Sequence, residues 1–271
     1  MPKHRLIATL LVDNGNVVQT RFFKRTNMVG SAFTAVDFFN GWTVDEIVVL
    51  EISPNESPLP RAKEIVRELS RRCFVPLSVG GKIRDLSLAA EFLRIGADKV
   101  VINTGAVERP GLITEIAERY GVQCVLVSID GKPDPSMPSG YRVVIDNARR
   151  DTDLDAVAWA KKVVELGAGE IMVNSTTHDG NKQGYDLKLT NAVSRAVSVP
   201  VIAMGGAGKL SDFVDGIVEG GADAVAAGNI FHYFEHSTKK AKEAMAAAGL
   251  PVRHIGFYQV NMPRRPKYRP H

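Results

Sequence analysis

Two pairs of adjacent glycines lie in the chain where a backbone could bind an anion. Gly80-Gly81 follows the apolar segment Val75–Val79, and Gly205-Gly206 lies just after the apolar segment Val199–Ala203. Glycine lets the main chain approach an anion closely and present free N–H groups, and the N-terminus of a following helix adds a favourable dipole. Either pair alone would indicate only a turn, but together they indicate two sites for phosphate groups.

Residues at neighbouring segment ends extend both sites. Asn103-Thr104 ends one apolar run, and Gly228-Asn229 follows another, where it could open a short helix. Loops that follow neighbouring strands of a barrel often bind phosphate. Two equivalent sites across one barrel mouth would suit an elongated ligand with a phosphate at each end.

The sequence around these glycines occurs twice, at a period of about half the chain. Segments 74–107 and 198–231 each contain an apolar run with a proline, a Gly-Gly pair, an amphipathic stretch, a Gly-Ala-Asp and a second apolar run. The preceding segments 44–49 and 168–173 also match. Such a repeat predicts a barrel of two similar halves.

Short β-branched runs alternate with helical segments along the chain, which predicts an α/β protein with parallel strands. The runs are apolar almost throughout, as expected for strands buried on both faces. Because eight of each are predicted, we expect a (β/α)8 TIM barrel with a half-barrel internal repeat. The predicted strands are Arg5–Val12, Glu46–Ile52, Val75–Val79, Lys99–Asn103, Cys124–Asp130, Glu170–Asn174, Val199–Ala203 and Ala224–Ala227. The predicted helices are Ala32–Asn40, Pro60–Arg72, Leu86–Ile95, Pro110–Tyr120, Leu154–Leu166, Leu187–Val197, Leu210–Glu219 and Ser237–Ala247.

Two segments interrupt this alternation at equivalent places in the two halves. Asn14-Gly15-Asn16 turns into Val17–Phe23 after the first strand, and Gly131–Gly140 leads to Tyr141–Ile145 after the fifth. Turn residues between apolar runs predict hairpins, here at the C-terminal end of the barrel.

The composition is that of an ordinary globular protein, with 271 residues that are 45% apolar and 24% charged. We expect a barrel domain over residues 1–258 and a basic, Pro- and Arg-rich tail over 259–271, which is either a solvated end or a contact for a partner or anionic ligand. The net charge of +4 and the short apolar runs predict no nucleic-acid or membrane partner. Cys73 and Cys124 predict reduced, buried thiols, and the first residues do not resemble a signal peptide, so we expect a cytoplasmic protein.

Several segments in a fixed order resemble the cyclase subunit of imidazole glycerol phosphate synthase, over about Arg5 to Arg253. The matching segments are Gly96-Ala97-Asp98-Lys99-Val100, Ile102-Asn103-Thr104, Gly167-Ala168-Gly169-Glu170-Ile171, Asp179-Gly180, Gly184-Tyr185-Asp186, Gly205-Gly206-Ala207-Gly208 and Phe231-His232. We expect a phosphorylated small-molecule ligand, and neither a metal ion nor an organic cofactor. The phosphate-binding residues expected are Gly80, Gly81, Asn103, Thr104, Asp179, Gly180, Gly205, Gly206, Gly228 and Asn229.

In that family, a glutaminase subunit docks at the N-terminal face of the barrel, where a ring of four charged residues forms the ammonia entrance. The resemblance assigns this ring to Arg5, Glu46, Lys99 and Glu170, each of which opens a predicted strand. Two cations and two carboxylates at one barrel end can pair in a closed ring. The alternative is a salt-bridge plug that only neutralises buried charge.

The family's chemistry uses two aspartates at the other barrel end, as general acid and base on a bisphosphate ribonucleotide. The resemblance assigns one catalytic aspartate to Asp130, whose alternative role is to cap the Gly131 turn. The place of the other is held by Leu11, which cannot transfer a proton. Asp13 would face the same side if the first strand continued, about 6–7 Å further along.

Other departures from the family lie at the same barrel end. Gln19 replaces a lysine, Glu51 an aspartate and Lys82 a third glycine. Thr177-His178 replaces an acidic and basic pair, and Met204 replaces a small polar residue. The reacting centre is therefore expected to differ more than the phosphate sites do.

Three functions remain open at this stage. The first is a divergent subunit that takes ammonia from a glutaminase for a different acceptor, as in the branch that acts with an ATP-using amidotransferase to form an acetamidino group on a surface-polysaccharide sugar. The second is an authentic cyclase of histidine biosynthesis. The third is a non-catalytic barrel that binds a phosphorylated ligand or scaffolds a complex.

Overall fold

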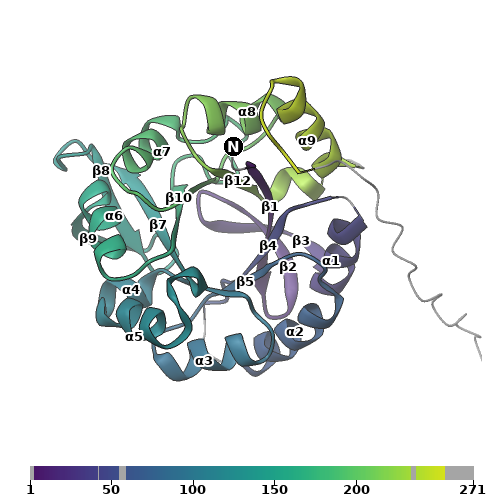
Figure 1. Cartoon of the computed structure of the whole chain (residues 1–271), viewed down its shortest axis with the longest axis horizontal. Coiled ribbons are helices and arrows are strands. Elements are labelled where there is room, and N and C mark those ends of the chain that lie inside the picture. Colours follow the sequence, from purple (N-terminus) through teal and green to yellow (C-terminus); the bar gives the residue numbers. More distant parts are fainter. Residues whose placement is uncertain (1–2, 42, 55–58, 233–235, 254–271) are drawn as a thin grey trace, which may run out of the picture.

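Eight parallel strands close into a barrel, and helices cover its outside (Figure 1). The computed structural model describes residues 3–41, 43–54, 59–232 and 236–253. The barrel strands are β1 (Arg5–Asp13), β4 (Glu46–Glu51), β5 (Leu77–Gly80), β6 (Lys99–Ile102), β7 (Val125–Pro133), β10 (Glu170–Ser175), β11 (Val201–Met204) and β12 (Ala224–Ala227). The sheet closes because β1 pairs with both β4 and β12, while β10 pairs with both β7 and β11. The predicted fold class is confirmed.

A helix follows each barrel strand, as the alternating pattern predicts. These helices are α1 (Ala32–Gly41), α2 (Leu59–Arg72), α3 (Leu86–Arg94), α5 (Gly111–Tyr120), α6 (Ala156–Glu165), α7 (Leu187–Ser194), α8 (Leu210–Val218) and α9 (Ser237–Ala247). Two short turns adjoin the C-terminal strand ends: the helix α4 (Thr104–Glu108) and the 3-10 turn η2 (Asn229–His232). The short helix expected after Gly228 is therefore present as η2, whereas α4 was not predicted.

Several predicted boundaries are wrong by a few residues. β5 and β11 begin after Pro76 and Pro200, because proline has no N–H to donate to a strand ladder. The fourth predicted strand, which is β6, ends before Asn103, and Asn103 is the N-cap residue of α4. Leu154 belongs to a strand rather than to a helix, since α6 begins only after Asp155, whose side chain accepts from two backbone N–H groups of the first turn.

Both predicted hairpins are present, and they lie at the C-terminal ends of β1 and β7. The first consists of β2 (Asn16–Arg21) and β3 (Lys24–Ser31), with β1 running on through Asp13 to pair with β2. The second consists of β8 (Tyr141–Ile145) and β9 (Arg150–Asp155), with β7 running on past Asp130 to pair with β8. The prediction that the first and fifth strands stop at the barrel edge is thus corrected.

The barrel has an apolar core on each side of its sheet. Outside, strand and helix side chains form the larger cluster, as expected for helices that pack on a parallel sheet. Inside, a smaller cluster fills the barrel between its two ends: Ile7, Val48, Val101, Leu126, Met172, Ile202, Met204, Ala224 and Ala226, with Leu11 and Leu50 packed against it. Polar chemistry is therefore confined to the two ends of the barrel.

The cysteine prediction is partly wrong. Cys73 and Cys124 are free thiols, but both are only half-buried. Within the described part of the chain, no helix is long and apolar enough to cross a membrane. The predicted tail over 259–271 lies outside the described residues.

Candidate active site

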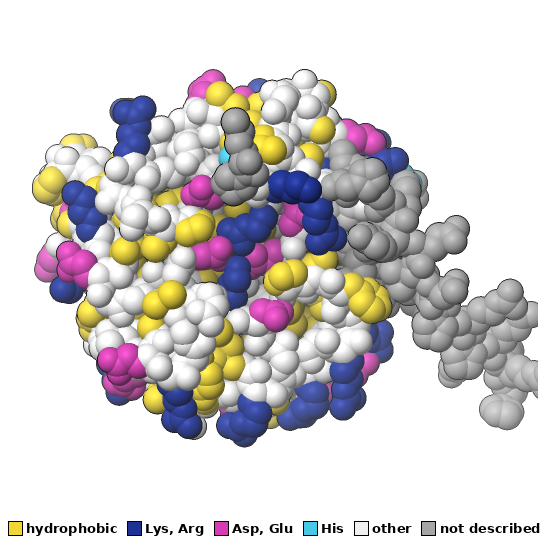
Figure 2. Space-filling model, in the orientation of Figure 1, with side chains coloured by type: hydrophobic (Ala, Val, Ile, Leu, Met, Phe, Trp, Pro, Cys, Tyr) yellow, Lys and Arg dark blue, Asp and Glu magenta, His cyan; other side chains and the backbone are white. Residues whose placement is uncertain are grey.

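Four charged side chains pair in a closed ring at the N-terminal end of the barrel. Arg5 bonds Glu46 at 2.8 Å and Glu170 at 2.7 Å, and Lys99 bonds the same two carboxylates at 3.0 and 2.6 Å. Figure 2 shows side chains of both charge signs gathered at the centre of the molecule. The four residues assigned to the ring are therefore brought together with alternating charge.

The ring is anchored most deeply at Glu46, whose side chain is 2% exposed. Ser78 of β5 donates to its Oε1 at 2.6 Å, while Oε2 is the oxygen that Arg5 and Lys99 share. Burial alone would lower the pKa of Arg5, but the two carboxylates raise it above its usual value. Ser78 was not singled out from sequence, because a serine within an apolar run carries no distinctive signal.

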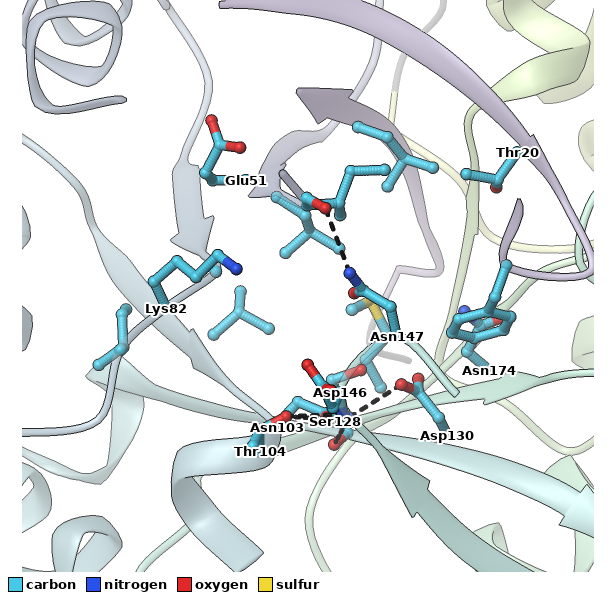
Figure 3. Close-up of a pocket in the computed structure, with 18 of the residues that line it drawn as sticks. Thr20, Glu51, Lys82, Asn103, Thr104, Ser128, Asp130, Asp146, Asn147 and Asn174 are labelled. Atoms are coloured by element: carbon cyan, nitrogen blue, oxygen red, sulfur yellow. Dashed lines mark hydrogen bonds between the residues drawn. The ribbon is translucent and has the colours of Figure 1, made fainter. Parts of the chain in front are cut away.

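A cavity of about 410 Å³ opens at the opposite end of the barrel. Its walls come from strand ends around the barrel and from both hairpins, and Asp146 and Asn147 of the β8–β9 turn lie over it (Figure 3). The turn is tied in place on two sides, since Asp146 N donates to Thr104 Oγ1 and Asn147 Nδ2 donates to Ile52 O. The second hairpin thus reaches across to the end of β4.

The two places assigned to catalytic aspartates both face this cavity. Asp130 is 7% exposed and accepts a hydrogen bond from Asn103 Nδ2 at 3.1 Å. Burial, together with the charge of Asp179, raises the pKa of Asp130 to about 7, although the bond from Asn103 acts in the other direction. Such a carboxyl group can hold or release a proton at neutral pH. Leu11 offers no such group and packs against the apolar interior.

Asp13 also lines the cavity, but its carboxylate already has partners. Arg25 of β3 pairs with Oδ2 at 2.5 Å, while Ser53 Oγ and Asn14 Nδ2 bond Oδ1 at 2.9 and 2.8 Å. β1 continues one residue beyond its predicted end, through Asp13, so the condition under which Asp13 would lie at this end is met. Asp13 is nevertheless held as the partner of Arg25.

The first expected phosphate site adjoins the main cavity. Gly81, Asn103 and Thr104 line this cavity, as does Lys82, which was not among the expected phosphate-binding residues. Gly80 does not line the cavity: it lies buried in β5, where a Cβ atom would meet Val101 at 2.7 Å. Packing alone therefore requires glycine at position 80.

The second expected phosphate site is a smaller cavity of about 30 Å³ beside the first. Six of the expected residues line it: Asp179, Gly180, Gly205, Gly206, Gly228 and Asn229. Several of their polar groups hold the first hairpin. Thr20 Oγ1 and Phe23 N donate to the Asp179 carboxylate at 3.0 and 2.8 Å, and Asn229 Nδ2 donates to Thr20 O at 2.8 Å. Asp179 thus fixes the base of the hairpin in this structure.

Among the described residues, no group of histidine, cysteine and carboxylate side chains could hold a metal ion.

Comparison with known proteins agrees with the sequence resemblance. The family described as histidine biosynthesis protein matches residues 5–237. The chain is 43% identical over 249 residues to "Imidazole glycerol phosphate synthase subunit HisF" of Clostridium botulinum strain Okra, covering 92% of this chain and 98% of that protein. It is equally similar to the HisF of strain Langeland, and 42% identical to that of strain 657.

Proposed function

Since the chain belongs to the histidine biosynthesis protein family, as a relative of the HisF cyclase subunits, we propose that it is the ammonia-accepting barrel of a glutamine amidotransferase complex. Ammonia enters through the ring of Arg5, Glu46, Lys99 and Glu170 and reaches an acceptor in the cavity at the other end. One observation carries this proposal: the charged ring is complete, whereas the cavity is lined by Asp130 and by Leu11 in the place of a second aspartate.

The N-terminal face also offers contacts for a glutaminase subunit. Phe74, Val122 and Val218 are 73%, 52% and 63% exposed. Phe74 and Val122 lie just before β5 and β7, and Val218 ends α8, the helix before β12, so all three lie toward the end of the barrel where strands begin. Exposed apolar side chains around a charged centre suit a protein interface with buried anchors.

The absence of a carboxylate at position 11, where Leu11 stands, favours an acceptor other than the family's bisphosphate ribonucleotide. In its specific form, the proposal is that the ammonia serves the conversion of an N-acetyl group of a surface-polysaccharide sugar to an acetamidino group, with an ATP-using amidotransferase as a further partner. This form is supported by the altered reacting centre and by the resemblance of the sequence to that branch.

A second candidate is an authentic cyclase of histidine biosynthesis. Two observations favour it: the identity of 43% to HisF subunits, and the presence of Asp13 with Asp130 in the wall of one cavity. In that case Asp13 would take the part of the missing carboxylate. Asp13 must then act while Arg25 is paired with it or after Arg25 moves.

Binding of a glutaminase subunit tests the docking part of the proposal. The purified chain is mixed with the glutaminase subunit of an imidazole glycerol phosphate synthase, and the dissociation constant is measured by sedimentation. We expect Phe74→Asp to weaken binding about tenfold or more, because it puts a charge in place of an exposed apolar side chain that the bound subunit would cover. Phe22→Asp is the matched control, since Phe22 is 43% exposed on the hairpin at the opposite end. Failure of the wild type to bind, or equal weakening by both variants, would contradict the proposal.

A further inference from the structure

Three polar side chains form a buried chain beside the cavity, at the ends of β1 and β4. Ser53 Oγ contacts Asp13 Oδ1 at 2.9 Å, and it also contacts Glu51 Oε1. The backbone N–H of Asn14 donates to Ser53 Oγ at 2.9 Å. Ser53 is fully buried, and Glu51 is 6% exposed.

These contacts can be satisfied only with one further proton. A serine hydroxyl has one proton to donate and two lone pairs to accept with. One lone pair takes the Asn14 N–H, so Ser53 can donate to only one of the two carboxylates that it touches. The other carboxyl group must then donate to Ser53, which requires it to be protonated.

The surroundings decide which carboxyl group holds that proton. Asp13 is paired with the Arg25 guanidinium and accepts from Asn14 Nδ2, and both contacts favour its ionised form. Glu51 has no cation within ion-pair distance among the described residues, and its Oε2 is buried there without a hydrogen-bond partner. An ionised carboxylate with a bare buried oxygen is costly.

We propose that Glu51 is a positioning residue that stays protonated at neutral pH and donates to Ser53, so that Ser53 donates to Asp13 and keeps that carboxylate ionised in the cavity wall. The cavity then holds two carboxyl groups with different tasks. Asp13 is the one paired with Arg25 and Ser53, and burial raises the pKa of Asp130 to about 7. Groups whose environments separate their protonation states can serve as base and acid for an ammonia acceptor.

The charged groups around Glu51 agree with this assignment. Burial is the largest influence and raises the pKa of Glu51, as does the charge of Asp13 from β1. The contact with the Ser53 hydroxyl lowers it, as do the hydrogen bond from the Ser53 backbone N–H to Glu51 Oε1 and the charge of Lys82 from the loop after β5. Arg25 lies beyond Asp13 on β3, and Asp146 of the β8–β9 turn lines the same cavity. Figure 3 shows Glu51 and Asp130 on different sides of this cavity.

The test is a carbon-13 titration of the chain alone, with glutamate labelled at the side-chain carboxyl carbon. The Glu51 resonance is assigned by its loss in Glu51→Gln, whose amide can donate to Ser53 in place of the carboxyl proton. The same resonance should be missing in Glu51→Asp, which gives a second assignment. We expect the resonance to keep the shift of a protonated carboxyl group at pH 7. An ionised shift at pH 7 would overturn the proposal.

A second variant tests the coupling through Ser53. Asp13→Asn removes the ionised competitor, so Ser53 is free to donate to Glu51. We expect the Glu51 midpoint to fall by about one pH unit, the size of one hydrogen bond to a charged group. Asp151→Asn, which removes an exposed partner of Lys132, is the control and should leave the midpoint unchanged. An unchanged midpoint in Asp13→Asn would also overturn the proposal. Only the acid and base roles rest on the proposed function; the titration needs neither glutaminase nor acceptor.

Discussion

Replacing Lys99 by methionine removes one of the two cations of the ring and tests whether the ring is a paired unit. Its ammonium group lies 3.0 Å from Glu46 Oε2 and 2.6 Å from Glu170 Oε2, and its side chain is 15% exposed. Breaking a fully buried ion pair costs about 3–5 kcal/mol. Because Arg5 still pairs with both carboxylates and the ring partly contacts solvent, we expect a loss of about 2 kcal/mol from the free energy of unfolding.

The assay is urea unfolding at neutral pH, and the free energy of unfolding extrapolated to zero urea is compared between the variants. Lys162→Met is the matched control, because Lys162 pairs with Glu165 on an exposed helix surface and both side chains are more than half exposed. It should cost no more than about 0.5 kcal/mol. Equal losses in the two variants would refute the ring as a coupled, buried unit. The same Lys99→Met protein should lose glutamine-dependent function when its glutaminase partner is present.

Two further experiments test buried charges elsewhere in the barrel. The free energy of unfolding of the wild type should fall relative to that of Asp130→Asn as pH rises from about 4 to about 7. The reason is that the folded-state pKa of Asp130 is raised, so folding favours its neutral form. Parallel profiles of urea midpoint against pH for the two proteins would argue against this. Lys242 of α9 is fully buried and pairs with Asp45 at 2.6 Å. Lys242→Met should therefore lower the free energy of unfolding by about 3 kcal/mol, because it leaves the Asp45 carboxylate without this partner. The double variant Lys242→Met, Asp45→Asn should lower it by less. Thermal denaturation of both variants checks this, and an equal or greater loss in the double variant would contradict it.

The ring could be predicted from sequence because strand starts in a parallel barrel all lie at one end. Arg5, Glu46, Lys99 and Glu170 each open an apolar run, and the fold brings them together whatever their separation in the chain. Ser78 could not be found in this way. Its role depends on β5 lying beside β4 with Ser78 opposite Val48, a register in which the Ser78 hydroxyl reaches Glu46, and only the paired strands reveal this.

The chemistry of the cavity was only partly predictable. Asp13 and Glu51 were singled out separately, but Ser53, which joins them, follows β4 in a segment without a motif. The turn over the cavity was also unexpected, because Asp146 and Asn147 both adopt positive φ without being glycine. Such conformations are held by tertiary bonds, here to Thr104 and Ile52, rather than by local preference.

The central claim is that the barrel has kept its ammonia entrance but has changed the reaction at the cavity. It is tested most directly by supplying the purified chain with the bisphosphate ribonucleotide of the cyclase family and an ammonium salt, which bypasses any glutaminase. With Leu11 in place of the acid or base, we expect no turnover above about one thousandth of an authentic HisF rate, since a positioned proton-transfer group contributes about 10²–10⁴-fold. Product formation at an ordinary cyclase rate would contradict the account.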